Sequence, residues 1–378
     1  MKLGRFKLKH YINYIAIGIF TLVMAAIVLS GNRLKSTSLY LFEGMAISII
    51  LAVSLSLVVG FLGELSLGHA GFMCVGAYIG AKIGNLLFAT MGNSIGIFLI
   101  SLLGGALAAA VCGIIIGIPA LRLRGDYLAI VTLAFGEIVR SLFRNAPEEL
   151  FGGLNGIDTG AIRYNKQHFF IIAFVLVLVT LAVIQNLMRS KHGRAITAIR
   201  DNEIAARATG INVTRYKLLV FTISAMFAGI AGVLLCFSKN NIGDKMFNYN
   251  YSIEILVMVV LGGMGNINGS IVSAILITYL NTKLPTILTG DLAVLQNLLY
   301  ALILIVIVIY NNAPALKGFR DKHSISAFIE KRKKVHDPSN IKDDKAKWDV
   351  VPTKISMDEI LSVDLVPQDI NCKDGGDK

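Results

Sequence analysis

Ten apolar stretches alternate with shorter polar segments along the chain, and this pattern gives the first prediction of the fold. A helix needs about 20 mostly apolar residues to cross the hydrocarbon core of a bilayer. We therefore predict an all-α, polytopic integral membrane protein with about ten transmembrane helices. The two short stretches that flank Gly262–Gly265 could instead form one broken element. The predicted spans are residues 12–30, 39–60, 64–84, 95–118, 126–143, 168–188, 217–237, 252–264, 266–283 and 294–311.

Two of the apolar regions are interrupted by glycine, which is a poor helix former. One lies around Gly60–Gly71 and the other around "LGGMGNINGS" (261–270). Irregular backbone survives at membrane depth only where protein buries it or where it lines a wet cavity. Broken segments in corresponding halves of a chain are typical of transport pathways made from internal repeats. We predict two related halves with broken, glycine-rich elements, and the repeat itself is a hypothesis.

Composition and charge support a membrane protein and set its orientation. The chain is 55% hydrophobic and 16% charged, with a mean hydropathy of +0.67, whereas a soluble domain is about 25% charged. The net charge of +12 falls almost entirely before residue 317, and residues 1–10 and 189–217 are its densest basic segments. Lys and Arg are retained in the cytoplasm, so we place both segments and both termini there. Basic residues dispersed between spans argue against nucleic-acid binding.

The chain is predicted to divide into a transmembrane domain, residues 1–315, and a polar cytoplasmic tail, residues 316–378. The tail is polar and of mixed charge, so we expect it to be largely disordered. The basic start and apolar stretch of residues 1–30 have no convincing cleavage site, which favours an uncleaved first helix. The four cysteines lack C-x-x-C spacing, so neither a disulfide framework nor a metal site is predicted.

Ionisable groups inside the spans are candidates for a translocation path, because they are expensive in lipid and usually face such a path. Glu64 and His69 lie in the first glycine-rich stretch, although Glu64 could also lie at the cytoplasmic interface. Glu137 and Arg140 lie on one helical face, either as an ion pair near the outer rim or as part of a polar stripe facing the path. The candidate path and gate residues are Gly63, Glu64, Ser66, Gly68, His69, Gly71, Phe72, Glu137, Gly262, Gly263 and Gly265.

The cytoplasmic connection 189–217 contains a predicted short helix, "NEIAARATG" (202–210). Asn202 or Asp201 can cap its start, alanines favour its continuation, and Gly210 is suited to its end. A helix of small residues is a surface that can enter another protein's cleft, and the alternative is a solvated connector. The sequence has no P-loop, H-E-x-x-H or G-x-S-x-G motif. We therefore expect no ATP site, cofactor or catalytic residue in this chain.

Four stretches together resemble the permease subunit of branched-chain amino acid ABC importers. They are "GELSLGHAGFMCVGAYIGA" (63–81), "LRLRGDYLAIVTLAFGEIVR" (121–140), residues 198–235 and "LGGMGNINGS" (261–270). Their order and spacing also agree, so the resemblance covers about residues 40–312. The wider group includes ribose-type sugar permeases, and the second stretch favours the amino acid branch.

The resemblance implies that the loop helix, with its E-A-A-x-x-x-G pattern, docks into a partner ATPase. Ile204 occupies the acidic position of that pattern, with Glu203 one residue earlier. The implied partners are a second permease subunit, two cytoplasmic ABC ATPases that bind ATP and Mg, an extracytoplasmic binding protein, a small-molecule substrate and the lipid membrane. The implied docking residues are Asn202, Glu203, Ala205, Ala206 and Gly210.

The expected function is import of branched-chain or related hydrophobic amino acids across the bacterial cytoplasmic membrane. ATP hydrolysis in the partner subunits drives alternating access, and the binding protein sets most of the selectivity. One alternative is a ribose- or nucleoside-type permease of the same superfamily. The other is an ion-coupled secondary transporter, for which Glu64, His69 and Glu137 are the candidate ion ligands.

Overall fold

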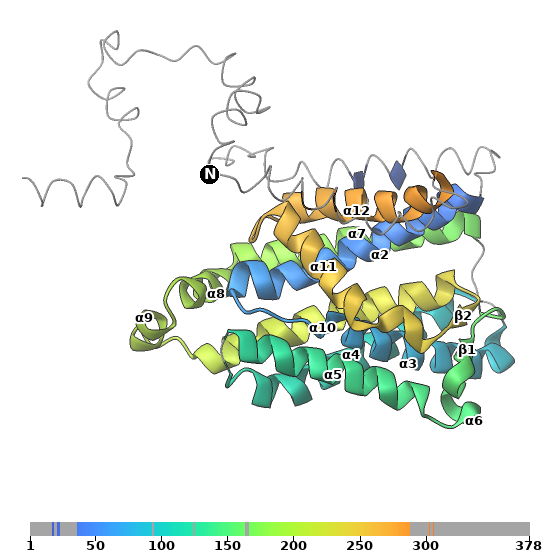
Figure 1. Ribbon diagram of the computed structural model, residues 1–378, viewed down its shortest axis with the longest axis horizontal. Coiled ribbons are helices and arrows are strands. Elements are labelled where there is room, and N and C mark those ends of the chain that lie inside the picture. The colour runs from blue at the N-terminus through green and yellow to red at the C-terminus, as the bar shows by residue number, and fades with distance from the viewer. Residues whose placement is uncertain are drawn as a thin grey trace, which may run out of the picture. The chain divides into compact units, whose positions relative to one another are not determined.

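The computed structural model describes residues 17–18, 21–22, 36–92, 94–123, 125–162 and 166–287, with residues 302 and 305. These segments are mostly helical (Figure 1). Most of the predicted spans 12–30 and 294–311, and the whole tail 316–378, lie outside the described residues. The prediction of ten spans and the prediction of a disordered tail therefore stay predictions.

The long helices account for most of the described chain. The short elements are α6 (Glu148–Phe151), α8 (Lys191–Asp201), α9 (Glu203–Ala208) and the 3₁₀ turns η3 (Gly153–Asn155) and η4 (Asp244–Phe247). The long helices are α2 (Ser36–Ser56), which continues as the π-helical turn η2 (Leu57–Leu62), α3 (His69–Met91), α4 (Ile95–Ala120), α5 (Asp126–Arg144), α7 (Lys166–Arg189), α10 (Val213–Ser238), α11 (Tyr249–Gly262) and α12 (Ile267–Ile287).

Five helical segments in the described residues are long and apolar enough to cross a membrane. The shorter helix α11 is also apolar. These segments agree with an integral membrane protein and with five of the predicted spans. They are Thr37–Leu62, His69–Phe88, Ile95–Ala120, Phe169–Arg189 and Val213–Ser238.

At the two glycine-rich regions the helices begin and end at other residues than the predicted spans do. The span predicted to begin at residue 64 begins as a helix at His69, after a non-helical segment. The second region separates two helices, α11 and α12, and residues 263–266 between them are non-helical. The physical reason is the same in both places, since Gly63, Gly263 and Gly265 have positive φ angles that a continuing helix cannot use.

The long helices run between two different ends of the molecule (Figure 1). Helices α8 and α9 lie at one end, which we call the α9 end. At the other end, α6 lies beside the strands β1 (Ile157–Asp158) and β2 (Asn241–Ile242), which pair antiparallel. These two-residue strands are a small departure from the all-α prediction, and they join the loop after η3 to the loop after α10.

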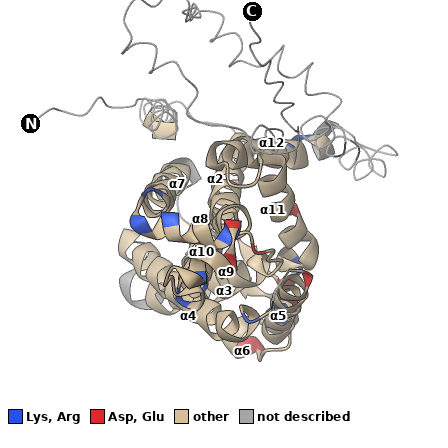
Figure 2. Ribbon diagram, turned by 90° about the vertical axis from the view of Figure 1, so that its left-hand side faces the viewer, with Lys and Arg blue, Asp and Glu red and all other residues tan. Residues whose placement is uncertain are grey.

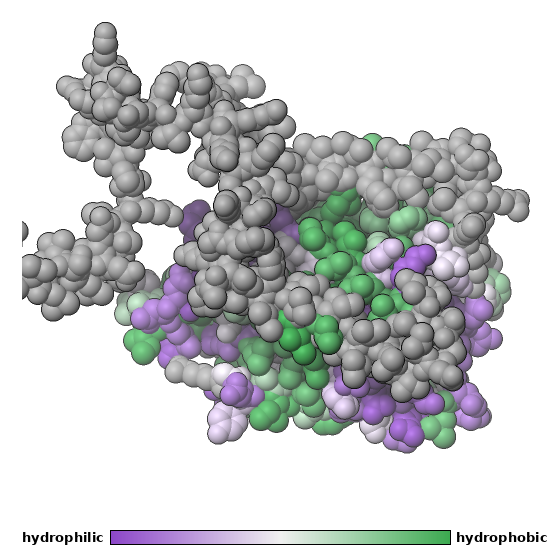
Figure 3. Space-filling model, turned by 45° about the horizontal axis from the view of Figure 1, so that its top comes forward, coloured by the Kyte–Doolittle hydropathy of each residue, from purple (hydrophilic) through white to green (hydrophobic). Residues whose placement is uncertain are grey.

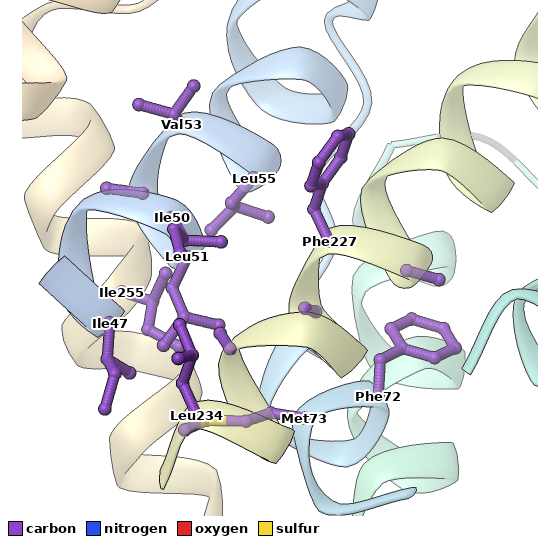
Figure 4. Close-up of a cluster of buried hydrophobic side chains, with 14 of the residues drawn as sticks. Ile47, Ile50, Leu51, Val53, Leu55, Phe72, Met73, Phe227, Leu234 and Ile255 are labelled. Atoms are coloured by element: carbon purple, nitrogen blue, oxygen red, sulfur yellow. The ribbon is translucent and has the colours of Figure 1, made fainter. Parts of the chain in front are cut away.

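Helix α2 is the most buried of the five candidate spans in the described residues. In α4 only 33% of the most apolar 18-residue stretch is buried, whereas for α2, continued by η2, this share is 89%. Helix α2 packs against α7, α10, α11 and α12. Figure 4 shows Ile50 and Leu51 of α2 close to Ile255 of α11 and Leu234 of α10. Lipid is as apolar as these side chains, so close packing stabilises this core more than removal from solvent does.

The surface visible in Figure 3 has a hydrophobic band with more hydrophilic residues toward both ends. Helix α4 exposes large apolar side chains along most of its length, and this exposure suits a helix that faces lipid or another membrane subunit. The exposed residues of α4 are Ile95, Leu99, Ile100, Leu103, Leu107, Val111, Ile114, Ile115 and Ile118.

Candidate functional site

The first break, residues 63–68, lies between the π-helical turn η2 and the start of α3. Gly63 adopts a left-handed conformation with φ 80°. Its N–H donates to the carbonyl of Val58, as does the N–H of Glu64 at 3.2 Å. Glycine adopts this conformation without the steric cost of a Cβ atom. A π turn followed by a left-handed glycine therefore ends the first helical segment before α3 begins.

Side chains from other helices satisfy backbone groups of the break. The N–H of Leu67 donates to Oγ1 of Thr132 on α5 at 3.0 Å. The N–H of Ala70, in the first turn of α3, donates to Oγ of Ser252 on α11 at 3.1 Å. Unpaired backbone groups are not tolerated in hydrocarbon. Side chains of α5 and α11 thus bind the backbone of the irregular segment and of the first turn of α3.

His69 is buried and hydrogen-bonded. Its Nε2 lies 2.8 Å from Oγ of Ser54, and the Ser54 carbonyl accepts from Oγ of Ser224 at 2.6 Å. Ser66 is also buried. The ring of Phe72 lies near two other aromatic rings, with centroids 5.0 Å from Phe135 and 5.5 Å from Phe221. His69, Ser66 and Phe72 are thus packed inside the helix assembly, and their role in a translocation path stays a prediction.

Two glycines of this region bring α3 against α5. A Cβ atom added at Gly68 would lie 2.5 Å from the backbone oxygen of Thr132. A Cβ atom added at Gly71 would lie 2.6 Å from Cα of Gly136. Both distances are shorter than real side-chain contacts. These two glycines therefore permit the close approach of α3 to α5.

The two glycine-rich regions meet in space. Gly263 and Gly265 have φ angles of 88° and 81°. A Cβ atom at Gly60, in η2, would collide with the backbone nitrogen of Gly265. Gly262 is equally restricted, because a Cβ atom there would collide with the backbone nitrogen of Ser270. Gly265 of the second region therefore lies beside the helical turn that leads into the first break.

A buried ion pair connects the first break to α9. The side chain of Lys217, at the start of α10, forms a salt bridge with Glu64. Its Nζ also lies 3.3 Å from Oε2 of Glu203, the first residue of α9. Lys217 is 5% exposed, and the two carboxylate side chains are 12% and 21% exposed. Opposite charges compensate each other here, where a lone charge would be costly.

Arg200 of α8 makes a second connection. Its Nη1 donates to the carbonyl of Gly60 at 3.2 Å, and its Nη2 pairs with Asp201 at 3.0 Å. A Cβ atom at Gly63 would lie 2.8 Å from Cγ of Arg200. Gly63 therefore provides both the left-handed turn and the space that the arginine occupies.

Helix α9 forms where the sequence predicted a loop helix. The Asn202 side chain caps its start by accepting from the N–H of Ala205 at 3.0 Å. Gly210 follows its end with φ 87°. Both signals are confirmed. The preceding helix α8 was not predicted, and it buries Ile196 and Ile199 against the rest of the chain.

The residues of α9 face in different directions. Ala206 is only 4% exposed, whereas Ile204 is 77% exposed. Ala205 and Gly210 are exposed as well, and Glu203 is intermediate because it reaches Lys217. Figure 2 views this end of the molecule, where both basic and acidic residues occur. Ala206 therefore supports the helix from inside, and Ile204 is the large apolar side chain that it presents outward.

Glu137 belongs to a different cluster. Its carboxylate pairs with Arg140 at 2.8 Å and accepts from the N–H of Tyr249, which begins α11, at 3.1 Å. Arg140 also binds Asp244 of η4 at 2.9 Å. The i, i+3 ion pair considered from the sequence is present, and this cluster ties α5 to η4 and α11.

Several residues of the site carried little signal in the sequence. In the sequence Lys217 belongs only to the basic connection 189–217. The one available signal is its charge, which is opposite to that of Glu64 in the distant break. The hydroxyl residues offered no local signal, because their partners are far away in the chain. These residues are Ser54, Thr132, Ser224 and Ser252.

Comparisons with known proteins agree with this architecture. A family model described as "Branched-chain amino acid transport system / permease component" matches residues 36–309. The "High-affinity branched-chain amino acid transport system permease protein LivM" of Escherichia coli is 40% identical over 262 residues. That alignment covers 61% of this chain and 60% of the relative, and the same protein of Salmonella typhimurium is 39% identical over the same shares.

The chain thus spans about 60% of the length of these curated relatives. A more distant relative is the "Ribose import permease protein RbsC" of Escherichia coli, which is 28% identical over 145 residues. That alignment covers 37% of this chain and 44% of the relative. No solved structure matches the chain.

Proposed function

Because the chain belongs to the family of branched-chain amino acid transport system permease components, we propose that it is the membrane-spanning permease subunit of an ABC importer. It carries leucine, isoleucine, valine or a related hydrophobic amino acid across the bacterial cytoplasmic membrane. The family match over residues 36–309 and the identity of about 40% to the LivM relatives support this substrate class.

The observation that carries the mechanism is the placement of α9. This short helix is capped at Asn202, exposes Ile204 and connects through Glu203 and Lys217 to the glycine-rich break. We infer that α9 docks into a cytoplasmic ABC ATPase. Movement of the ATPase on binding and hydrolysing ATP then reaches the helices around the break, where two glycine-rich elements meet.

In this proposal the complete importer has the subunits that the resemblance of the sequence implies. Two ATPase subunits bind ATP and Mg, a second permease subunit completes the membrane part, and an extracytoplasmic binding protein delivers the substrate. The α9 end and both termini face the cytoplasm. About ten helices in two related halves form the membrane domain, and the two meeting breaks support such halves.

Two alternatives receive less support. The ribose permease relative is less similar and aligns over a shorter part of the chain. An ion-coupled carrier would use Glu64, His69 and Glu137 as ion ligands, but each has a structural partner: Lys217, Ser54 and Arg140 respectively. These partners favour structural roles for the three side chains.

The proposal is tested by purification of the tagged, full-length chain in a mild detergent, followed by mass spectrometry of the proteins that accompany it. We expect a P-loop ATPase and a second permease in stable association. An ATPase together with a binding protein that binds ribose rather than leucine would support the sugar alternative. Repeated purification of the chain alone, from membranes that contain the ATPase, would contradict the ABC assignment.

A further inference from the structure

A series of charged side chains runs from the exposed face of α9 to the glycine-rich break. Arg207 pairs with Glu203 at 2.8 Å, Glu203 with Lys217 at 3.3 Å, and Lys217 with Glu64. We propose that Lys217 is the positioning residue that couples the docking helix to the break, so that displacement of α9 moves the segment at Glu64. This inference rests on the proposed function, in which α9 docks into the ATPase.

The burial of Lys217 is the first observation that supports this role. Side-chain exposure decreases from α9 inward: it is 62% at Arg207, 21% at Glu203 and 5% at Lys217. Lysine is almost never fully buried unless it is paired. Its ammonium group is shared by carboxylates from two elements far apart in the sequence, and removing it would leave Glu64 buried without that partner. A shift of Glu203 therefore acts directly on the group that holds Glu64.

The position of Glu64 is the second observation. It follows the left-handed Gly63, and its N–H closes the π-helical turn onto Val58. Three residues later the N–H of Leu67 binds Thr132 of α5. The carboxylate is therefore attached to the segment whose conformation decides where η2 ends and α3 begins. Moving it changes the relation between these helices.

Arg200 supplies a parallel connection from the same end. It binds the carbonyl of Gly60, which faces Gly265 in the second glycine-rich element. Helices α8 and α9 are consecutive, with Asn202 between them. The docking segment consequently contacts the first glycine-rich element at two points, Gly60 and Glu64. A side chain with a flexible stem and a compact charge, such as lysine, can keep contact with both carboxylates while the segment moves.

The test measures coupling in the assembled importer. The complex is reconstituted into vesicles with its ATPase and binding protein, and leucine uptake and ATP hydrolysis are measured on the same preparation. We expect Lys217→Met to retain the ATPase and its hydrolysis while uptake per ATP falls between about 5-fold and 150-fold, the range of typical coupling energies. Arg215→Met is the matched control, because it removes an exposed positive charge two residues away on α10. It should leave uptake per ATP within about twofold of the wild type.

A second variant separates coupling from folding. Replacing both members of a buried ion pair by apolar residues is often neutral for stability, so Glu64→Met combined with Lys217→Met should fold even if the single variant does not. We expect this double variant to bind the ATPase and to stay uncoupled. Uptake per ATP at the wild-type level in the double variant would show that the ion pair serves stability alone, and would overturn the inference.

The proposed function can fail separately. If the wild-type complex takes up leucine without hydrolysing ATP, the ABC assignment is wrong whatever the variants do. If the wild type couples uptake to hydrolysis and the Lys217 variants couple equally well, only the role of Lys217 is wrong.

Discussion

Single glycines determine how closely the helices approach at the break. Gly68 and Gly71 let α3 lie against α5, and Gly60 lets η2 lie against Gly265. Buried polar side chains then bind the backbone groups that the irregular segment leaves unpaired, as Thr132 binds Leu67. At this scale the unusual composition of residues 60–71 has a structural cause. Bulky residues at these glycines would separate the helices, and an apolar residue in place of Thr132 would leave the N–H of Leu67 without its partner.

Replacing Gly68 by alanine tests this packing. The added Cβ atom would lie 2.5 Å from the Thr132 oxygen, so α3 and α5 must separate. We expect Gly68→Ala to lower the free energy of unfolding by about 1–3 kcal/mol, the usual effect of overpacking. Gly243→Ala is the control, because a Cβ atom there meets no atom within 4 Å. Thermal unfolding in detergent measures both, and equal stability of the two variants would contradict the packing argument.

At the scale of elements, α9 is a short helix with an inner and an outer face. Ala206 faces the protein and Ile204 faces outward. Its start depends on the Asn202 cap, and its end is followed by the left-handed Gly210. A six-residue helix is marginal by itself. Its attachment through Glu203 and Lys217 therefore holds it against the bundle.

Substitutions on the two faces of α9 should have different effects. Ile204→Asp places a charge on an exposed position, so we expect normal yield and melting temperature but weaker retention of the ATPase. Ala206→Asp buries a carboxylate, which is costly, so we expect loss of folded protein. Yield, melting temperature and co-purified ATPase are measured for both variants. Normal ATPase retention by Ile204→Asp would exclude this face of α9 as the docking surface.

The helix ends and the glycine-rich breaks could be predicted from the sequence. The contacts between distant elements could not. Glycine runs marked both breaks, and Asn202 and Gly210 marked the ends of the loop helix, because such signals are read from neighbouring residues. The contact between Gly60 and Gly265, and the pair of Glu64 with Lys217, join residues more than 150 positions apart. Periodicity and capping carry no information on such distant pairs. The sequence likewise does not reveal that Ala206 faces inward, because its burial depends on packing of α9 against other parts of the chain.

At the scale of the molecule, the described helices combine a deeply buried helix with an apolar outer surface. Among the candidate spans α2 is buried most, and α4 exposes a long row of apolar side chains. The hydrophobic band of Figure 3 lies between hydrophilic ends. Both the core and the outer surface are therefore apolar. Such a surface is stable in a bilayer because lipid is as apolar as the protein interior.

A charge on the outer face of α4 tests the orientation of this surface toward lipid. Leu107 lies near the middle of α4 and is 62% exposed. Insertion of an aspartate at the centre of a transmembrane helix costs about 2.5–3.5 kcal/mol. We expect Leu107→Asp to reduce the amount of inserted protein, while Leu107→Ala leaves it near the wild-type amount. Carbonate extraction of membranes measures insertion, and equal insertion of both variants would argue against lipid contact at this position.

ATP-driven uptake in a defined system tests the central claim most directly. The chain is reconstituted with its second permease, its ATPase and its binding protein, and radiolabelled leucine is supplied on the binding-protein side with ATP on the ATPase side. The account predicts leucine accumulation that requires both ATP and the binding protein and that persists when proton and sodium gradients are collapsed. Uptake that follows an ion gradient and continues without ATP would contradict it.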